Sequence, residues 1–319
     1  MNLRHLRGST YAIENKNASA GFSASASSGF SSVGLGLYLF EDQSCLLVDS
    51  GAGPAAAQEI LQLLEASGWT VYAILNTHAH ADHSGGNHYI QEKTQCRVYA
   101  SAIEAAFINN PVLIPYAMYS ACPPKILTGK YFMPQASRVS HIVKPGKRQI
   151  KGKRFELLDL AGHSPGQLGI MTPDRVLFVG DCLISQEILT ANPFLYLADP
   201  GKQIASLRML KTANYEQLYL AHGGLVEDTA GVLKTNEEML KAIVHDIKDI
   251  IAQPRSLEAI IQEIIDLYSL PVNRNHYFRL ANSIAAFLSF LCNQGQARFY
   301  VDDNHLLYTR CIIKHFERF

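Results

Sequence analysis

The chain of 319 residues lacks the features that mark several protein classes. Its six cysteines form no CxxC pair, and a chain this long needs no disulfide framework, which favours free thiols in a reducing cytosol. Lys and Arg number 28, as do Asp and Glu, so the formal net charge is zero. This balance gives no general attraction to nucleic acid or to an anionic membrane.

Long apolar runs are also missing. No stretch of about 20 apolar residues is present to span a bilayer. Residues 1–11 carry arginine, but no apolar core follows them, so they are unlike a signal peptide. We therefore expect a cytoplasmic protein that acts on a small-molecule substrate, without a membrane or nucleic-acid partner, and keep a homodimer as an option.

What the sequence does contain is a dense histidine cluster. Residues 77–83 read Thr-His-Ala-His-Ala-Asp-His, directly after the apolar, strand-like run Val71–Leu75. Neutral imidazole and carboxylate suit zinc, iron or manganese, and zinc typically takes about four ligands. His78 and His80 can point the same way on an extended loop, while Asp82 and His83 can face a second position. The cluster predicts a metal-dependent hydrolase.

Three further residues have the same setting. His163, Asp181 and His222 each follow an apolar strand and a small residue, and each stands at a turn. Any one of them alone is typical of an ordinary turn residue. Together with the histidine cluster, they supply the additional ligands that two metal sites require.

These motifs resemble the metallo-β-lactamase superfamily over roughly residues 33–250. The resemblance implies an α/β fold, a four-layer αββα sandwich with the site at the sheet edges. It also implies that His78, His80 and His163 hold one metal, that Asp82, His83 and His222 hold another, and that Asp181 bridges both. Asp49 resembles the buried aspartate that supports the metal loop in this family, with an ordinary turn aspartate as the alternative.

The complete ligand set implies a branch of the superfamily. Asp181 resembles the bridging residue of the glyoxalase II, lactonase and ribonuclease branches, which true β-lactamases generally lack. His80 stands where the oxygen-reducing diiron branch has Glu. We expect a hydrolase of a small-molecule thioester or ester, with endoribonuclease or other nuclease activity and a mononuclear iron persulfide dioxygenase-like enzyme as alternatives.

The mechanism that follows uses two divalent metal ions, with zinc first and iron or manganese as alternatives. Two metals about 3.5–4 Å apart can hold a hydroxide at neutral pH, and this hydroxide attacks the substrate. Asp82 is expected to be the catalytic residue that orients the nucleophile and passes a proton to the leaving group.

Substrate recognition is expected from residues 110–137, a long connection with five prolines and little periodicity. Tyr116, Tyr119, Cys122 and Tyr131 are the candidates to line a pocket, unless these aromatic side chains merely pack the connection onto the domain.

Three units are predicted: an N-terminal segment (1–32) with a Ser/Ala/Gly-rich loop, a catalytic domain (33–253) and a C-terminal domain (254–319). The last reads as two helices and a hairpin around Asp302-Asp-Asn304, which predicts a winged-helix-like module. Such tails resemble those of a mitochondrial endoribonuclease of the superfamily. With seven basic and six acidic residues in 255–319, nucleic-acid binding is disfavoured, and we expect the module to pack against the catalytic domain or to form a roof over its pocket.

Overall fold

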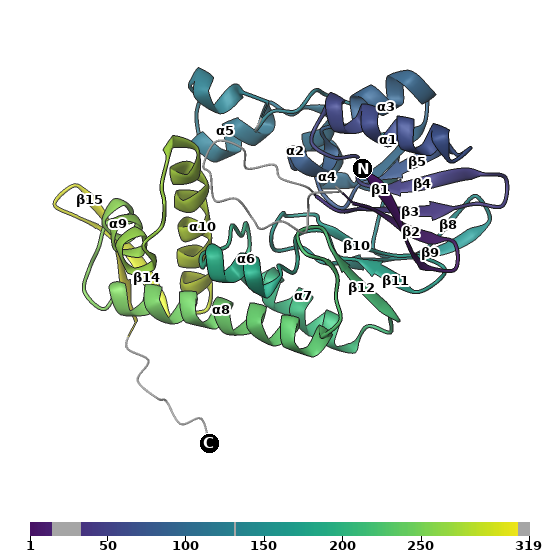
Figure 1. The fold of residues 1–319 in the computed structure, drawn as a ribbon. Helices are drawn as coiled ribbons and strands as arrows, with labels where there is room; N and C mark the ends of the chain where they lie inside the picture. Colours follow the sequence, from purple (N-terminus) through teal and green to yellow (C-terminus); the bar gives the residue numbers. More distant parts are fainter. Residues whose placement is uncertain (15–32, 131, 312–319) are drawn as a thin grey trace.

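Two β-sheets packed face to face form the centre of the molecule (Figure 1). The structure is a computed structural model that describes residues 1–14, 33–130 and 132–311. The loop predicted over residues 17–32 and the predicted pocket residue Tyr131 lie outside the described residues.

The first sheet has seven strands in sequence order. They are β1 (Asn2–Arg7), β2 (Thr10–Glu14), β3 (Leu35–Leu39), β4 (Ser44–Val48), β5 (Thr70–Leu75), β6 (Arg97–Ser101) and β7 (His141–Val143). The strands are antiparallel from β1 to β4 and parallel from β4 to β7. The sheet therefore begins before residue 33, because the first 14 residues supply its first two strands.

The second sheet has six strands, in the order β13-β12-β11-β10-β9-β8. They are β8 (Gly146–Ile150), β9 (Lys153–Asp159), β10 (Leu168–Met171), β11 (Val176–Phe178), β12 (Gln217–Leu220) and β13 (Gly224–Leu225). Only β11 and β12 run parallel, and the other neighbours are antiparallel. Side chains of both sheets meet between them in one apolar layer that includes Tyr38, Phe155 and Phe178.

Helices cover both outer faces. α1 (Pro54–Ala66) and α3 (Asn87–Thr94) pack against the first sheet, while α7 (Pro200–Thr212) and α8 (Thr229–Ile250) cover the second. In α1, Pro54 begins the helix where its missing N–H costs nothing, and the buried residues Ala57, Ile60 and Leu64 form one stripe. The predicted four-layer αββα arrangement is confirmed.

Shorter helices stand in the connections. They are α2 (Ala81–Ser84), α4 (Ala102–Asn109), α5 (Leu113–Tyr119), the 3₁₀ helix η1 (Lys125–Thr128) and α6 (Gln186–Ala191). The predicted connection over residues 110–137 contains α5 and η1, although its five prolines and weak periodicity gave no sign of a helix. Pro115 is tolerated in α5 because it lies in the first turn, where a backbone N–H has no acceptor within the helix.

The C-terminal part consists of α9 (Leu257–Tyr268), α10 (Arg274–Asn293), β14 (Ala297–Asp302) and β15 (His305–Arg310). It is not separated from the rest by a gap in the core. Ile264 and Phe287 belong to the same buried cluster as Leu177 and Leu218 of the second sheet. The winged-helix identity stays a prediction. No helix in the described ranges combines the length and the apolar composition needed to cross a bilayer.

This shared core predicts that the C-terminal helices unfold together with the sheets. Phe287→Ala removes a side chain with 0% exposure and should lower the free energy of unfolding by about 3–5 kcal/mol. The single tryptophan, Trp69, packs at the first sheet, so its fluorescence and the helical circular dichroism should shift together in denaturant. Leu267→Ala, at a 58% exposed position on α9, is the control. Loss of helix before the Trp69 transition would show a separately folding C-terminal unit.

Candidate metal centre

The seven residues predicted as metal ligands come together at one end of the two sheets. They form two groups, within each of which the ligand-type atoms all lie within 4.8 Å of one another. The first group is His78, His80, His163 and Asp181, and the second is Asp82, His83 and His222.

The strand ends explain this convergence. β5 ends at Leu75, and the chain then runs through His78 and His80 into the short helix α2, which carries Asp82 and His83. His163 stands in the turn after β9, Asp181 follows β11, and His222 follows β12. Because β5, β9, β11 and β12 all end at this edge, residues far apart in sequence become neighbours.

The atoms of the first group are spaced like ligands of one ion. Nδ1 of His80 lies 3.0 Å from Nε2 of His78 and 2.9 Å from Nε2 of His163. Oδ2 of Asp181 lies 3.3 Å from Nε2 of His163. Tetrahedral zinc with ligands at about 2.0–2.1 Å would place neighbouring ligand atoms about 3.3 Å apart. The residues therefore fit a divalent metal.

Asp181 lies between the two groups. Its Oδ2 faces the first group, and its Oδ1 lies 3.1 Å from Nε2 of His83 and 3.5 Å from Nε2 of His222. Oδ2 of Asp82 lies 3.5 Å from the same atom of His222. One carboxylate thus presents a different oxygen to each group.

Two buried atoms at this point lack hydrogen-bond partners. Nε2 of His83 and Oδ1 of Asp181 are both shielded from solvent and unsatisfied. Buried polar atoms in native proteins are nearly always hydrogen-bonded, so a pair of orphans 3.1 Å apart needs an explanation. A cation bound to both atoms would satisfy them.

The electrostatics differ between the groups. Burial lowers the pKa of His78 and His163, and it lowers that of His80 to about 3, so these rings are neutral and have a free lone pair. Burial also opposes a charge on His222, but the carboxylates of Asp181 and Asp82 outweigh it and raise its pKa to about 10. The second group is therefore built to hold positive charge, whether as protons or as a metal.

Asp49 supports the histidine loop through three hydrogen bonds. Its Oδ1 accepts a hydrogen bond from the backbone N–H of Thr77 at 2.7 Å, and its Oδ2 accepts from Thr77 Oγ1 at 2.7 Å. His83 donates from Nδ1 to the same Oδ2 at 2.8 Å, which leaves its Nε2 lone pair directed at Asp181. These contacts are those of a supporting residue rather than of an ordinary turn aspartate.

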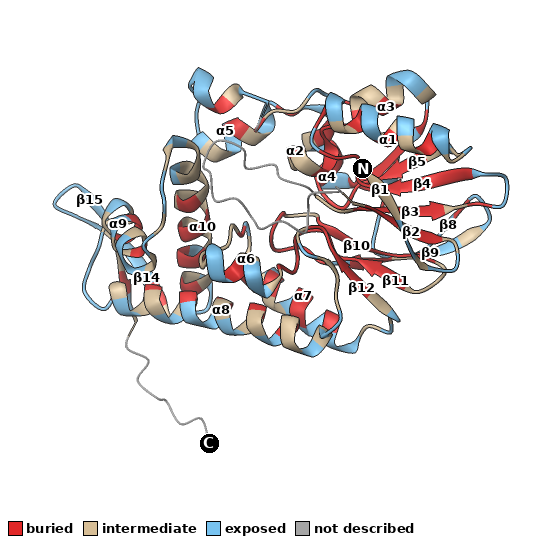
Figure 2. Ribbon diagram, in the orientation of Figure 1, coloured by how far each residue is buried: buried red, intermediate tan, exposed pale blue. Residues whose placement is uncertain are grey.

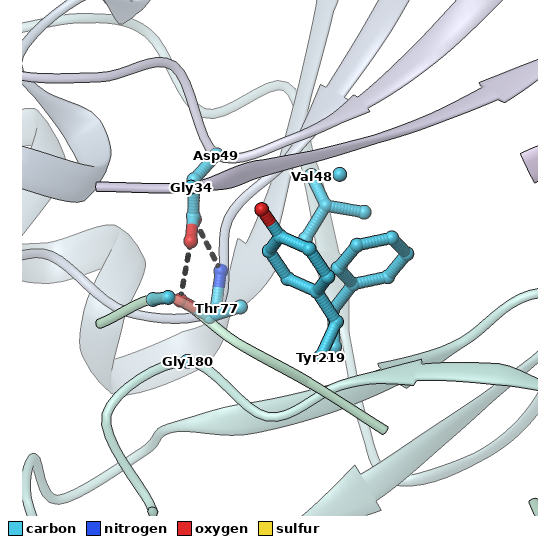
Figure 3. Close-up of a pocket in the computed structure, with 9 residues that line it drawn as sticks. Gly34, Val48, Asp49, Thr77, Gly180 and Tyr219 are labelled. Carbon is cyan, nitrogen blue, oxygen red and sulfur yellow. Dashed lines mark hydrogen bonds between the residues drawn. The ribbon is translucent and has the colours of Figure 1, made fainter. Parts of the chain in front are cut away.

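Figure 3 shows a small cavity that Asp49, Thr77, Gly180 and Tyr219 help to line, with Asp49 hydrogen-bonded to Thr77. Gly180 has φ +55°, and a Cβ there would come within 3.0 Å of Thr77 Oγ1. Glycine at this position therefore lets the chain turn tightly before Asp181.

Glu104 at the start of α4 is a supporting residue that the sequence did not reveal. Its Oε2 accepts from the N–H of Ala79 at 2.8 Å, while its Oε1 accepts from Ser164 Oγ and the Gly166 N–H, both at 2.8 Å. This buried carboxylate joins the loop of His78 and His80 to the turn of His163. A lone Glu in a helix gives no signal of such a role.

The profile of the metallo-beta-lactamase superfamily matches residues 37–222, more than half of the chain. The chain belongs to this superfamily. Hydroxyacylglutathione hydrolase of Methylococcus capsulatus is 41% identical over 148 residues, 44% of this chain and 47% of that protein. The Synechococcus enzyme of the same name is 27% identical over 192 residues, 57% of this chain and 60% of that protein.

The chain thus matches less than two thirds of the length of these relatives, which are hydrolases. Among solved structures, a metallo-beta-lactamase family protein from Thermus thermophilus has a TM-score of 0.72 at 20% identity, covering 95% of this chain and 99% of that one. A beta-lactamase domain protein from Burkholderia ambifaria also has a TM-score of 0.72, at 17% identity, covering 97% and 94%. These two likenesses show the fold.

Two residues at the border of this superfamily site were missed from sequence. The ring of Tyr196 lies 5.7 Å from that of His80 and 5.5 Å from that of His163, and its backbone carbonyl accepts from His163 Nδ1 at 3.0 Å. Arg279 of α10 lies over the Tyr196 ring, 5.4 Å from its centre. Neither residue stands in a motif, so only the fold brings them here.

Three of the four predicted pocket residues belong to the described part of the chain. Tyr116, Tyr119 and Cys122 are exposed, and α5 leans on α10 through Tyr119, whose ring is 5.6 Å from that of Phe278. The aromatic side chain of Tyr119 therefore packs the connection, which was the alternative interpretation. The role of these three residues in substrate binding stays a prediction.

Asp49→Asn should weaken metal binding by roughly 10–100-fold, because an amide has one acceptor oxygen and cannot accept from the Thr77 N–H, the Thr77 hydroxyl and His83 together. The loop of Thr77 or the ring of His83 then loses its fixed orientation. Chelator competition with metal counting by mass spectrometry measures this affinity. Asp42→Asn, at an exposed carboxylate in the turn between β3 and β4, is the matched control and should bind metal like the parent. An unchanged affinity in Asp49→Asn would return Asp49 to the status of a turn residue.

Proposed function

We propose that this protein is a binuclear metal-dependent hydrolase of a small-molecule thioester or ester. The observation that carries the proposal is the carboxylate of Asp181, which offers one oxygen to each group of ligand-type residues. The partial similarity to hydroxyacylglutathione hydrolases supports a thioester as the substrate class. Five imidazoles, two carboxylates and no thiolate favour zinc, with iron or manganese as alternatives.

The site residues have three kinds of role: holding the metal ions, transferring a proton and supporting the ligand loops. His78, His80 and His163 would hold one ion, Asp82, His83 and His222 the other, and Asp181 both. When bound, the ions would supply Lewis acidity toward the carbonyl oxygen and would lower the pKa of water at this site. Asp82 orients the nucleophile and passes its proton to the leaving group, while Asp49 and Glu104 keep the ligand loops in place.

Arg279 favours an anionic substrate at this site. Its charge is felt by His80 and His163, where it adds to burial in lowering both pKa values. Its guanidinium is held over the face of Tyr196, which borders the first group. A guanidinium in this position can bind a carboxylate of the substrate, at a distance from the bond that is cleaved.

Hydrolysis can be tested with a panel of glutathione and coenzyme A thioesters after zinc or iron is restored. The parent should hydrolyse at least one of them, and His80→Ala should reduce kcat/KM by more than about a hundredfold, beyond what supporting residues cost. His245→Ala, an exposed histidine of α8, is the control and should retain full activity.

Metal counting on the same samples separates the alternatives. Two ions per chain are expected. No turnover above that of His80→Ala on any thioester or ester would contradict the proposal. A single iron per chain with oxygen-dependent turnover would replace it by the dioxygenase-like alternative.

The charge preference has its own test. Arg279→Met should lower kcat/KM for carboxylate-bearing thioesters roughly 10–100-fold, because a hydrogen bond to a charged group is lost, and should leave neutral thioesters unaffected. Arg279→Lys should retain part of the preference. Arg274→Met, in the first turn of the same helix, is the control. An equal loss on neutral and anionic substrates would mean that Arg279 acts only on the structure.

A further inference from the structure

In the hairpin of β14 and β15, the turn determines which backbone groups face the partner strand and which face outward. Asp303 and Asn304 both have positive φ, +42° and +63°, as in the type I′ turn of a two-residue hairpin. Asp302 and His305 flank this turn and exchange both backbone hydrogen bonds. By alternation, the backbone groups of Arg298 and Tyr300 also face β15, whereas those of Phe299 and Val301 face away from it.

The opposite edge of the hairpin confirms this alternation and is already paired. Tyr308, which stands opposite Phe299, exchanges backbone hydrogen bonds with Arg255 at 3.0 and 2.8 Å. Arg310 donates its backbone N–H to the carbonyl of Ile251 at 2.7 Å. The outward-facing edge of β15 is thus joined to the body of the protein.

The edge of β14 is open. Within the described part of the chain, the outward backbone groups of Phe299 and Val301 have no hydrogen-bond partner. Their side chains are 59% and 70% exposed, and Figure 2 shows the outer part of the hairpin as exposed. An open edge with apolar side chains is a ready template for another strand, and natural proteins usually block such edges.

We propose that this edge pairs with β14 of a second copy of the chain, antiparallel about a two-fold axis at Tyr300. Phe299 then exchanges backbone hydrogen bonds with the partner subunit's Val301, and both of these residues have outward backbone groups, as the ladder requires. On one face, the apolar side chains of Phe299 and Val301 meet those of the partner subunit.

Charge selects this register. With the axis at Tyr300, Arg298 stands opposite the partner subunit's Asp302, and symmetry repeats the pair on the other side. Sliding the strands by two residues puts Arg298 or Asp302 opposite Tyr300, and sliding by four puts like charges opposite each other. Only the register centred on Tyr300 forms two ion pairs, so the edge is complementary to itself.

The hairpin also has room for a partner. It projects from the body beside α9 (Figure 1), and antiparallel pairing places the two bodies at opposite ends of the joined strands. Six residues of edge bury far less than the roughly 1,600 Å² of a standard interface. The dimer is therefore weak and dependent on concentration, and the metal centre lies outside it.

Sedimentation equilibrium of the full chain over a wide concentration range tests the proposal. The parent should show a monomer–dimer equilibrium. Arg298→Asp should weaken it roughly tenfold or more, because two ion pairs become two repulsions. Arg298→Asp combined with Asp302→Arg should restore it, since the pairs reform with reversed polarity. Lys234→Glu makes the same change of charge on the exposed face of α8 and should have no effect.

A backbone variant tests the edge directly. Val301→Pro removes an N–H that faces away from β15, so it spares the hairpin ladder and should abolish the dimer. Circular dichroism and turnover per chain should stay at the parental values in every variant. A parent that is monomeric at all concentrations would overturn the proposal, as would a dimer that Arg298→Asp and Val301→Pro both leave intact.

Discussion

The buried carboxylate of Asp181 is the group around which the site is organised. A carboxylate removed from water is costly unless opposite charge and hydrogen bonds surround it. Here five imidazoles and Asp82 lie around it, and its two oxygens face different groups. If every ring is neutral, Oδ1 of Asp181 and Nε2 of His83 remain without a hydrogen-bond partner. Positive charge between them resolves the conflict, which is why the geometry indicates a cation centre rather than a chance cluster of histidines.

The fold meets this requirement with rigid elements. The ligand residues follow strands that are themselves fixed between two apolar layers, so their backbone positions are set by burial and not by the metal. The strands do not determine the path of the short loops or the orientation of the rings. Asp49 and Glu104 fix both through hydrogen bonds. Both carboxylates are buried, and their oxygens accept hydrogen bonds from backbone N–H groups, hydroxyls and an imidazole. The site is therefore largely formed before any ion binds.

The sequence could predict the ligand-type residues because metal chemistry uses few residue types in compact patterns. Three histidines and an aspartate within one loop favour a metal site over other interpretations. The positions of His163, Asp181 and His222 at strand ends agree with this interpretation. Glu104, Tyr196 and Arg279 could not be found in this way, since they are common residues brought in by tertiary packing. The same limit applies to α5, which lies in a proline-rich connection with little periodicity, and to the first 14 residues, whose pairing with β3 depends on a distant strand.

Among the C-terminal helices, α10 contributes both to the core and to the border of the metal centre. α10 is held by Phe287, Leu288 and Leu291, which are buried in the core behind the second sheet. On another side, the same helix carries Arg279 to the border of the metal centre and receives α5. Because the buried stripe fixes the helix, the guanidinium is positioned without any contribution from the ligand residues. A single substitution at Arg279 therefore changes the charge beside the metal centre while the core and the ligand-type residues stay in place, and one fold can host different functions in this way.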